Sequence, residues 1–297
     1  MRAGFTRAHA AILATALLFS TGGAAIKACG LTAWQVAGFR SGVAALAMVL
    51  LVPAARQVSG RVLLVAVAYA ATLISFVLAN KLTSAAQAVF LQAAAPLYVV
   101  GLERWLLGTR MARRDLPILA LIAAGIVLLF FGSGERVATA PDPARGNVIA
   151  IASGLFYACL MVGLRWLAAG DARPGAGSAA AVWGNVLAFG VALPMALPVV
   201  ASRPVDWAVI GYLGTFQIAL PYYLMIRAMR TLTALDAAVL LLLEPLLNPT
   251  FVWLVHGETP TPMALAGGAL VLAATTWRSL TTPGGPAHNT PEVIQGT

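Results

Sequence analysis

The sequence predicts an all-α membrane protein, with ten transmembrane helices in two inverted five-helix repeats and both termini in the cytoplasm. Three observations predict this fold class. The chain has 297 residues, of which 60% are hydrophobic and only 10% charged, whereas soluble domains carry about 25% charged residues. Apolar runs of about 20 residues, the length that crosses a bilayer, recur along the chain. The second half of the chain also repeats the first.

The apolar runs give ten predicted spans, separated by short polar segments. A helix rises about 1.5 Å per residue, so about 20 residues cross the roughly 30 Å of hydrocarbon in a bilayer. The spans are residues 10–28, 34–53, 62–80, 85–106, 116–133, 147–168, 179–200, 206–227, 234–255 and 262–280. They leave no room for a soluble domain, and we expect the Pro- and Gly-rich residues 281–297 to form a disordered cytoplasmic tail.

The distribution of basic residues predicts the orientation in the membrane. Cytoplasmic segments of membrane proteins carry an excess of Lys and Arg. With a cytoplasmic N-terminus, thirteen of the 19 basic residues fall in cytoplasmic segments and five in external ones, and Arg40 alone lies inside a span. The net charge of +9 therefore reflects topology at an anionic inner leaflet, and it gives no reason to expect a nucleic-acid partner.

An internal repeat becomes visible when the chain is aligned with itself. At an offset of 149 residues, 83–110 aligns with 232–259 without gaps, and at an offset of 138, 14–27 aligns with 152–165. Each half therefore contains the same series of five spans.

The repeats are predicted to cover residues 1–140 and 141–280. Because five is odd, the second repeat must enter the membrane from the opposite side to the first. Inverted repeats around a central site are a recurrent architecture of secondary transporters. A duplicated bundle that serves as a scaffold or as an intramembrane enzyme is the alternative.

Four segments resemble the EamA family of the drug/metabolite transporter superfamily. They are LLFSTGGAAIK, GFRSGVAAL, LTSAAQAVFLQAAAPLYVVGLERWLLGTRMARRDL and LLLEPLLNPTFVWLVHGETPT. The resemblance covers residues 10–280, and within the family it is closest to the YddG-like amino-acid exporters. It implies two inverted five-helix repeats with substrate bound centrally, between spans one, three, four, six, eight and nine. The chain departs from the family pattern at Thr109, where many members carry Glu, whereas Glu258 does follow Gly257.

Ionisable residues inside a span are costly and are therefore candidates for function. Glu244 lies near the middle of span nine, where a lone carboxylate favours its protonated form. It is a candidate proton-coupling group or partner of a substrate amine, or else a structural carboxyl bonded to backbone freed by Pro245. Arg40 in span two either snorkels outward, pairs with a carboxylate or contacts the substrate. Asp236 is expected to be a solvated cap, and Lys27 an anchor at the interface.

Prolines inside three spans are candidate hinges. A proline frees the carbonyl four residues earlier and bends the helix axis. Pro96 and Pro245 occupy matching positions in spans four and nine, and Pro221 lies in span eight. The freed carbonyls either bind substrate or are satisfied by neighbouring helices.

Neutral polar, aromatic and small residues complete the predicted substrate site. They are Ser20, Thr21, Gly22, Gln87, Gln92, Tyr98, Tyr157, Tyr222, Tyr223 and Asn248. The small residues of span one also permit close helix packing, which is equally the simplest interpretation of the GxxxG formed by Gly38 and Gly42. A dimer face is the alternative for that pair, so the protein is expected to be a monomer or a dimer.

The sequence thus favours an inner-membrane secondary transporter that exports a small polar metabolite, most simply an amino acid, by alternating access. Alternatives are an exporter of cationic drugs, nucleobases or other metabolites, or an intramembrane enzyme or scaffold. We expect no cofactor and no metal, because the three histidines are far apart and the two cysteines have no metal-site spacing. There is no P-loop signature, so no ATP-binding domain is expected, and the expected partners are the substrate and the lipid bilayer.

Overall fold

The computed structural model describes residues 7–52, 56–95, 97–99, 101–102, 115–132, 136–169, 175–228, 240–241 and 243–281. Its helices are α1 (Arg7–Ser20), α2 (Gly22–Ala28), α3 (Ala33–Leu51), α4 (Gly60–Leu82), α5 (Ala85–Ala93), α7 (Asp115–Phe131), α8 (Pro143–Ala169), α9 (Ala176–Ala196), α10 (Pro204–Tyr212), the π-helical segment η2 (Leu213–Ala219), α11 (Leu220–Ala228), α13 (Leu243–His256) and α14 (Pro262–Thr281). Extended structure in these ranges is limited to an isolated bridge between Val137 and Ala140. The predictions for Pro96, Thr109 and Asp236 lie outside the described residues.

The predicted all-α class is confirmed, and every predicted span holds helix in its described part. Six helical segments of the described chain are long and apolar enough to cross a membrane. They are Arg7–Ala28, Ala33–Leu51, Gly60–Leu82, Pro143–Leu167, Ala176–Ala196 and Pro204–Met225. Shorter apolar helices cover Ala85–Val99, Leu116–Phe131 and Pro262–Trp277.

Polar caps fix where several helices begin. Thr32 and Gln35 form a reciprocal capping box at the start of α3. Ser59 and Ser84 each accept a hydrogen bond from the third backbone N–H of α4 and α5. At a helix C-terminus, α13 ends where Gly257 adopts a left-handed φ of 67°, a conformation that costs glycine little. Helix ends are therefore encoded locally, between the apolar runs.

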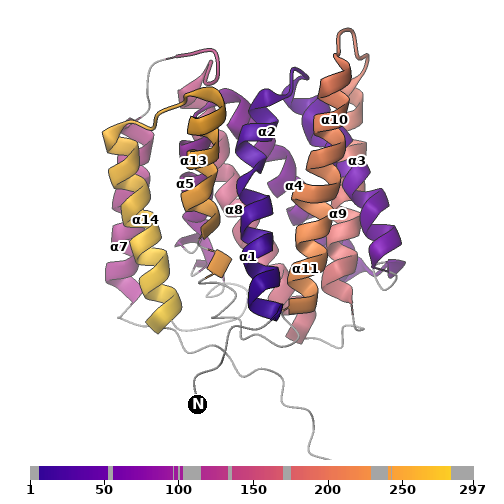
Figure 1. Ribbon diagram of the computed structural model, residues 1–297. Coiled ribbons are helices and arrows are strands. Elements are labelled where there is room, and N and C mark those ends of the chain that lie inside the picture. The colour runs from indigo at the N-terminus through magenta and orange to yellow at the C-terminus, as the bar shows by residue number, and fades with distance from the viewer. Residues whose placement is uncertain are drawn as a thin grey trace, which may run out of the picture.

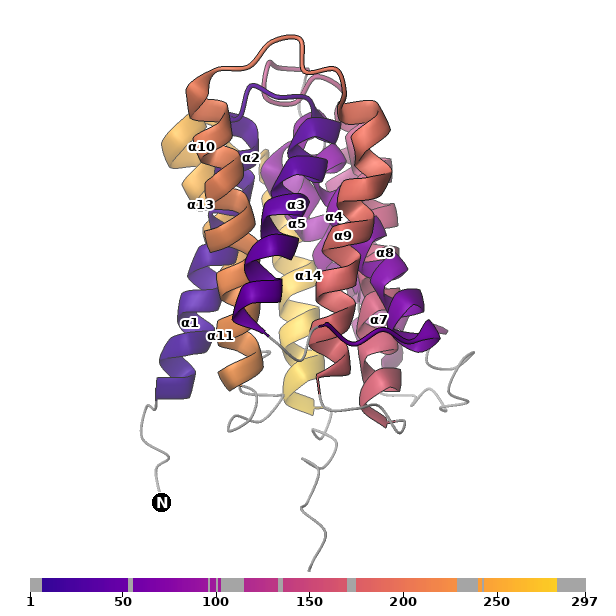
Figure 2. The same cartoon turned by 90° about the vertical axis from the view of Figure 1, so that its right-hand side faces the viewer.

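The helices of the two halves pack in a pattern that a two-fold axis would generate. α4 packs against α8 as its counterpart α11 packs against α1, and α5 packs against α8 as α13 packs against α1. α3 and α9 form a pair of counterparts at one edge, and α7 and α14 form another at the opposite edge (Figure 1). Figure 2 shows α1 and α11 side by side. The sequence repeat is thus reproduced in the helix contacts.

The first helices of the two halves run in opposite directions. α1 begins at the lower face in Figure 1, and α2 ends at the upper face. α8 begins at that upper face, because the Asp142 backbone N–H, one residue before it, donates to Leu82 O at the end of α4 (3.0 Å). Lys27 at the end of α2 also donates to Thr139 O just ahead of α8. The start of α1 and the end of α14 share the lower face (Figure 1).

Glycines bring pairs of helices into backbone contact. A Cβ on Gly125 of α7 would lie 2.8 Å from Gly267 O of α14, and a Cβ on Gly267 would lie 2.8 Å from Gly125 O. Gly38 and Gly42 pack against α9, where an added Cβ would lie 3.0 Å from the nearest side-chain atom. The GxxxG motif therefore serves packing within the chain.

The outer surface of the bundle carries many large apolar side chains. Leu46 is 65% exposed, Leu64 is 64% exposed and Phe131 is 72% exposed. Such exposure is unfavourable in water and favourable in hydrocarbon, so this surface faces lipid.

Candidate functional site

The helix of the first span breaks at Thr21, between α1 and α2. The hydroxyls of Ser20 and Thr21 donate to backbone oxygens about one turn earlier, and such back-bonding often bends a helix. The Thr21 hydroxyl also lies 2.8 Å from the Tyr212 hydroxyl of α10. The predicted hydroxyls of span one are therefore at a helix break, and they are engaged in hydrogen bonds.

The two glycines after this break lie directly against two amide side chains. A Cβ on Gly22 would lie 2.7 Å from Gln217 Nε2, and a Cβ on Gly23 would lie 2.4 Å from Asn248 Oδ1. Asn248 is completely buried, and neither its amide nitrogen nor its amide oxygen has a hydrogen-bond partner among the described residues. Because buried amides are normally bonded, Asn248 holds an unused donor and acceptor beside the break.

Gln217 belongs to the π-helical segment that precedes Pro221. Proline offers no N–H to the preceding turn, and a π-helical adjustment is one way for the backbone to recover its hydrogen bonds. Here the Leu220 N–H donates to Thr215 O, five residues earlier. The effect of Pro221 on the backbone of span eight thus takes the form of a π-helix, a feature frequent at functional sites. Its use as a hinge stays a prediction.

Arg40 of α3 is buried inside the bundle, with 1% of its surface exposed. Its Nη1 donates to Gln217 Oε1 and its Nη2 to Leu73 O, both at 3.2 Å, while Nε has no partner in the described part of the chain. Arg40 does not snorkel to the surface, and it pairs with no carboxylate of the described residues. Its hydrogen bonds go instead to neutral acceptors on neighbouring helices, Gln217 Oε1 and Leu73 O.

Tyrosines surround the guanidinium of Arg40. Tyr69 of α4 and Tyr222 of α11 are both within electrostatic range of it, and their ring centroids are 5.5 Å apart. Tyr222 also contacts Phe19 of α1 edge to face at 5.5 Å. The Tyr69 hydroxyl makes no hydrogen bond of ordinary length to a described residue, and only long, weak hydrogen bonds to Tyr222 and Asn185 reach it.

Glu244 lies near the described start of α13 and is half-buried. Its carboxylate interacts electrostatically with the hydroxyls of Tyr157 and Tyr222. No hydrogen bond or ion pair joins it to any described residue. Pro245 follows it in α13, and residues 240 and 241 before it are helical as well. The bend predicted there adjoins residues 229–239 and 242, which lie outside the described ranges.

These contacts define one site, which we name the central polar cluster. Its members are Arg40, Tyr69, Tyr157, Gln217, Tyr222, Glu244 and Asn248. They come from both halves of the chain, on α3, α4, α8, η2, α11 and α13. Sequence reasoning missed Tyr69 and Gln217 as site residues, because a tyrosine or an amide in an apolar helix carries no pattern that separates a site from the core.

Two predicted residues make their observed side-chain contacts with residues outside this cluster. Gln87 is buried near the start of α5, where it accepts from the Thr83 hydroxyl (2.9 Å) and donates to Leu129 O (3.0 Å). Tyr223, which follows Tyr222 in α11, accepts a hydrogen bond of 2.6 Å from Arg227 of the same helix.

Two further predicted residues lie on the face of α8. Gln92 Nε2 donates to the Ser153 hydroxyl at 2.8 Å. The ring of Tyr98 lies 3.4 Å from the position that a Cβ on Gly154 would occupy. α5 itself ends three residues before Pro96, which agrees with a helix irregularity near that proline. Both side chains therefore lie against α8, about one turn from Tyr157, which is the residue that α8 contributes to the central polar cluster.

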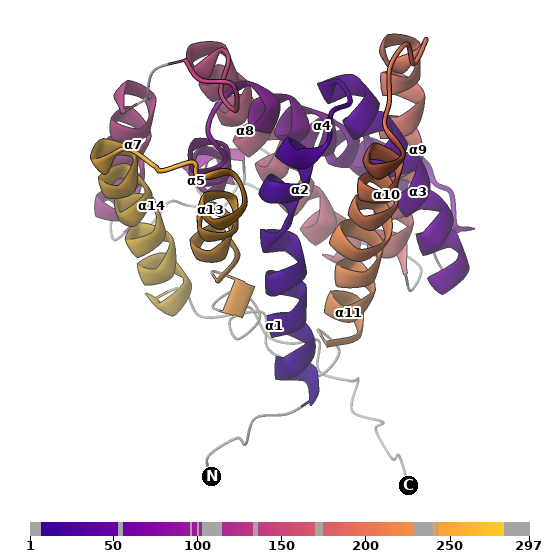
Figure 3. The same cartoon turned by 45° about the horizontal axis from the view of Figure 1, so that its top comes forward.

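An ion pair that sequence reasoning missed closes the upper face. Lys27 Nζ lies 3.0 Å from Glu258 Oε2, and the two side chains are only 2% and 9% exposed. Lys27 also donates to Thr83 O (2.9 Å), and Glu258 Oε1 accepts from the Ala85 N–H (2.7 Å) at the start of α5. The expectation that Lys27 is an interfacial anchor is wrong, because Gly257 turns the chain so that Glu258 meets it. Figure 3 shows α2 in the middle of this face, beside α13.

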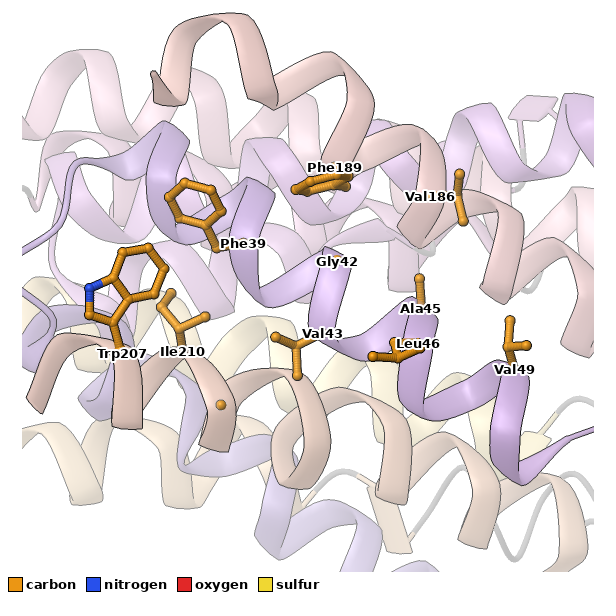
Figure 4. A pocket seen from close by; sticks show the side chains of 11 residues that line it. Phe39, Gly42, Val43, Ala45, Leu46, Val49, Val186, Phe189, Trp207 and Ile210 are labelled. Carbon is orange, nitrogen blue, oxygen red and sulfur yellow. The ribbon is translucent and has the colours of Figure 1, made fainter. Parts of the chain in front are cut away.

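A groove on the membrane-facing surface runs between α3, α9 and α10. Phe39, Val43 and Leu46 of α3 line it together with Phe189 of α9 and Trp207 of α10 (Figure 4). The labelled side chains are hydrocarbon apart from the indole nitrogen (Figure 4), so this groove offers no polar contact to a hydrophilic substrate. Among the described residues there is also no group of three or more His, Cys, Asp or Glu side chains that could hold a metal ion.

Comparison with known proteins identifies the family of this chain. The family model of the EamA-like transporter family matches residues 6–131 and again residues 144–279. An uncharacterized transporter of Archaeoglobus fulgidus is 29% identical over 209 residues, which cover 70% of this chain and 72% of its own. A crystal structure of a further protein has a TM-score of 0.62 and 18% identity, and the match covers 92% of this chain and 96% of that one. That last likeness shows the fold, whereas the double family match shows that this chain belongs to the EamA-like transporter family.

Proposed function

We propose that the protein is a secondary transporter of the inner membrane that exports small polar metabolites, and amino acids in particular, by alternating access. Ten spans in two inverted repeats, with cytoplasmic termini, would enclose the central polar cluster as the substrate site. One observation carries the proposal. Buried polar atoms at the meeting point of the two halves, namely Arg40 Nε and both amide atoms of Asn248, have no partner among the described residues. Polar atoms at this depth are costly unless a ligand or water completes their hydrogen bonds.

The contacts at the upper face support alternating access. Lys27 and Glu258 join α2 of the first half to the end of α13 in the second, and His256 Nε2 lies 2.9 Å from Ala24 O in the same place. Substrate can leave through that face only when these contacts open. The sequence counterpart of Glu258 in the first half is Thr109, so the other face cannot form the same ion pair at the equivalent position. The two faces would then open through different interactions.

Transport of labelled amino acids into proteoliposomes tests the function. We expect saturable flux for at least one amino acid, with none in protein-free liposomes. No flux with any amino acid, together with hydrolysis of a lipid or peptide, would replace transport by enzymatic activity.

Asn248→Leu is the matching test of the site. Leucine has nearly the same shape and removes two buried, unpaired atoms, so thermal stability should be kept or raised, while flux should fall by at least about tenfold because a substrate contact worth about 1.5 kcal/mol is lost. Thr250→Leu on the exposed side of the same helix is the control and should keep its flux. Full flux in a stable Asn248→Leu protein would remove the cluster around Asn248 from the pathway.

Export of cationic drugs is the second candidate function. The observation that favours it is the Glu244 carboxylate, which has no partner in the described chain and lies among the aromatic rings of Tyr157 and Tyr222. Aromatic rings with a carboxylate attract organic cations. Counterflow with a labelled aromatic cation distinguishes the two, because an amino-acid exporter would leave that flux at the level of empty liposomes.

A further inference from the structure

Arg40 is a buried cation with no carboxylate partner among the residues that the structure describes. Both of its hydrogen-bond acceptors are neutral, the Gln217 side-chain oxygen and the Leu73 backbone oxygen. The other described carboxylates near the bundle interior are engaged elsewhere, since Asp206 pairs with Arg203 and Glu258 with Lys27. A buried guanidinium normally pairs with an anion, because removing it from water without a counter-charge is expensive. An anionic group is therefore the ligand that this position is suited to bind.

Glu244 has the complementary requirement. Its carboxylate has no hydrogen-bond or ion-pair partner among the described residues, and Tyr157 and Tyr222 lie within its electrostatic range. It therefore offers a full negative charge, or an acceptor oxygen, to a cationic ligand. Tyr222 is within electrostatic range of both Arg40 and Glu244. The electrostatic partners of Arg40 are Tyr69 and Tyr222, and Glu244 is not one of them. No ion pair joins these two side chains, and Tyr222 lies within electrostatic range of each.

We infer that the substrate supplies both missing charges: its carboxylate binds Arg40 and its ammonium group binds Glu244, with Tyr222 between them. This inference rests on the proposed function and assigns the two ends of the amino acid to named residues. A guanidinium with a free Nε can bind a carboxylate through two N–H donors. The substrate side chain would then lie toward Phe19, whose ring contacts that of Tyr222.

The assignment predicts which part of the ligand each residue recognises. An amine without a carboxylate would use Glu244 alone, and a carboxylic acid without an amine would use Arg40 alone. Each lost charge-assisted contact should weaken binding by about ten- to a hundredfold. A zwitterion should therefore bind more tightly than either half-charged analogue.

Ligand-induced thermal stabilisation of the purified full-length protein tests this. The probes are leucine, 3-methylbutylamine, which is leucine without its carboxylate, and 4-methylpentanoate, which is leucine without its amine. The same three forms of phenylalanine and threonine extend the series. In the unmodified protein the amino acid should bind at least about tenfold more tightly than its amine or its acid.

Two substitutions then separate the ends of the ligand. In Arg40→Gln the affinity for the amino acid should fall to the affinity for the amine, while binding of the amine itself stays unchanged. In Glu244→Gln the affinity for the amino acid should fall to the affinity for the acid, while binding of the acid itself stays unchanged. Arg40→Lys keeps the cation and should preserve part of the preference. Arg61→Gln is the matched control, because Arg61 stacks over Trp166, 4.9 Å from the ring centroid, and should leave all affinities unchanged.

Several outcomes would overturn the inference. One is equal binding of amine, acid and amino acid, and another is a uniform loss of all three probes in both variants, which would mark Arg40 and Glu244 as structural. If Arg40→Gln does not purify as a folded protein, the affinities of Glu244→Gln and Arg40→Lys test the inference. An unchanged ranking of amino acid, amine and acid in both variants would overturn the inference. Amino-acid flux that persists with such an unchanged ranking would leave the proposed function standing. Neither flux nor stabilisation with any amino acid would remove the two proposals together.

Discussion

Single glycines determine how closely polar side chains approach the break in the first span. At Gly23 the backbone of α2 comes so close to Asn248 that an added Cβ would lie 2.4 Å from Oδ1 and 3.2 Å from a methyl carbon of Val252. The amide of Asn248 is completely buried, so it has little room to move away. The site therefore depends on the absence of a side chain as much as on the presence of polar ones.

Gly23→Ala should lower the stability of the protein by about 1–3 kcal/mol, because the added methyl overpacks a filled region. The measurement is thermal unfolding of the purified protein, followed by tryptophan fluorescence. Gly190→Ala is the control: nothing lies within 4 Å of its added Cβ, and alanine favours a helix over glycine by about 1 kcal/mol. Adding Asn248→Ala to Gly23→Ala should recover stability. A double variant no more stable than Gly23→Ala alone would contradict this explanation.

The central site could be predicted in part at the level of residues. Arg40 and Glu244 stand out in the sequence because ionisable groups inside apolar spans are rare, and Tyr157, Tyr222 and Asn248 join them in the structure. Tyr69 could not be singled out, since a tyrosine in an apolar span resembles any core aromatic. Whether the predicted residues bind substrate stays a prediction.

At the scale of helices, the upper face is held by an ion pair that connects the ends of five helices. Lys27 of α2 reaches Glu258 after α13, and each partner also bonds the backbone at the junction of α4 and α5 or ahead of α8. Carbonyl oxygens surround the ammonium group, and a helix N-terminus faces the carboxylate, so the polarity of the site is set by the backbone as well as by the pair. The surrounding backbone groups therefore favour a cation at position 27 and an anion at position 258.

Lys27→Met should destabilise the protein by about 3–5 kcal/mol, because it leaves Glu258 buried without a counter-charge. Lys27→Met combined with Glu258→Gln should lose less than Lys27→Met alone, since the double variant has no unpaired charge. The exchange Lys27→Glu with Glu258→Lys should not restore stability, because the backbone groups then face charges of the wrong sign. Thermal unfolding in detergent measures all four proteins. Full recovery in the exchanged protein would show that the backbone polarity has no role.

The sequence was a good guide to the helices and a poor one to their irregularities. Apolar runs long enough to cross a bilayer predicted helix in the right places, since length and hydropathy alone decide that question. The π-helical segment before Pro221 was not predicted, because one proline is compatible with a kink, a break or a wider turn. The ion pair of Lys27 was missed because two residues 231 positions apart meet only when the fold brings the two halves together.

For the whole molecule, the pairing of counterpart helices shows why one chain can hold a site between two similar halves. α3 with α9 and α7 with α14 form the two edges, and α1 and α8 each pack against helices of the other half. The centre is therefore formed by both repeats at once. A relative movement of the halves would change access to the central polar cluster from one face to the other, which is the movement that alternating access requires.

The orientation of the whole molecule in the membrane is a prediction from its charges, and two exposed valines can test it. Val200, between α9 and α10 at the upper face, is 89% exposed, and Val58, between α3 and α4 at the lower face, is 56% exposed. Single cysteines at these positions should differ in reaction with a membrane-impermeant maleimide. If thirteen of the basic residues face the cytoplasm, Val200→Cys is labelled in intact cells and Val58→Cys only after permeabilisation.

The chain has two native cysteines, Cys29 and Cys159. Replacing both with alanine removes the background of this labelling. Cys29, which lies beyond the end of α2 on the same face as Val200, is 2% exposed, and burial raises the pKa of its thiol, so little of the reactive thiolate forms at neutral pH. A wild-type chain should accordingly label more weakly than Val200→Cys even before that replacement. Labelling of Val58→Cys alone in intact cells would invert the assigned orientation. Labelling of both variants in intact cells would mean that the chain inserts in two orientations. A bias of thirteen basic residues to five argues against such dual insertion, which a weaker charge bias would permit.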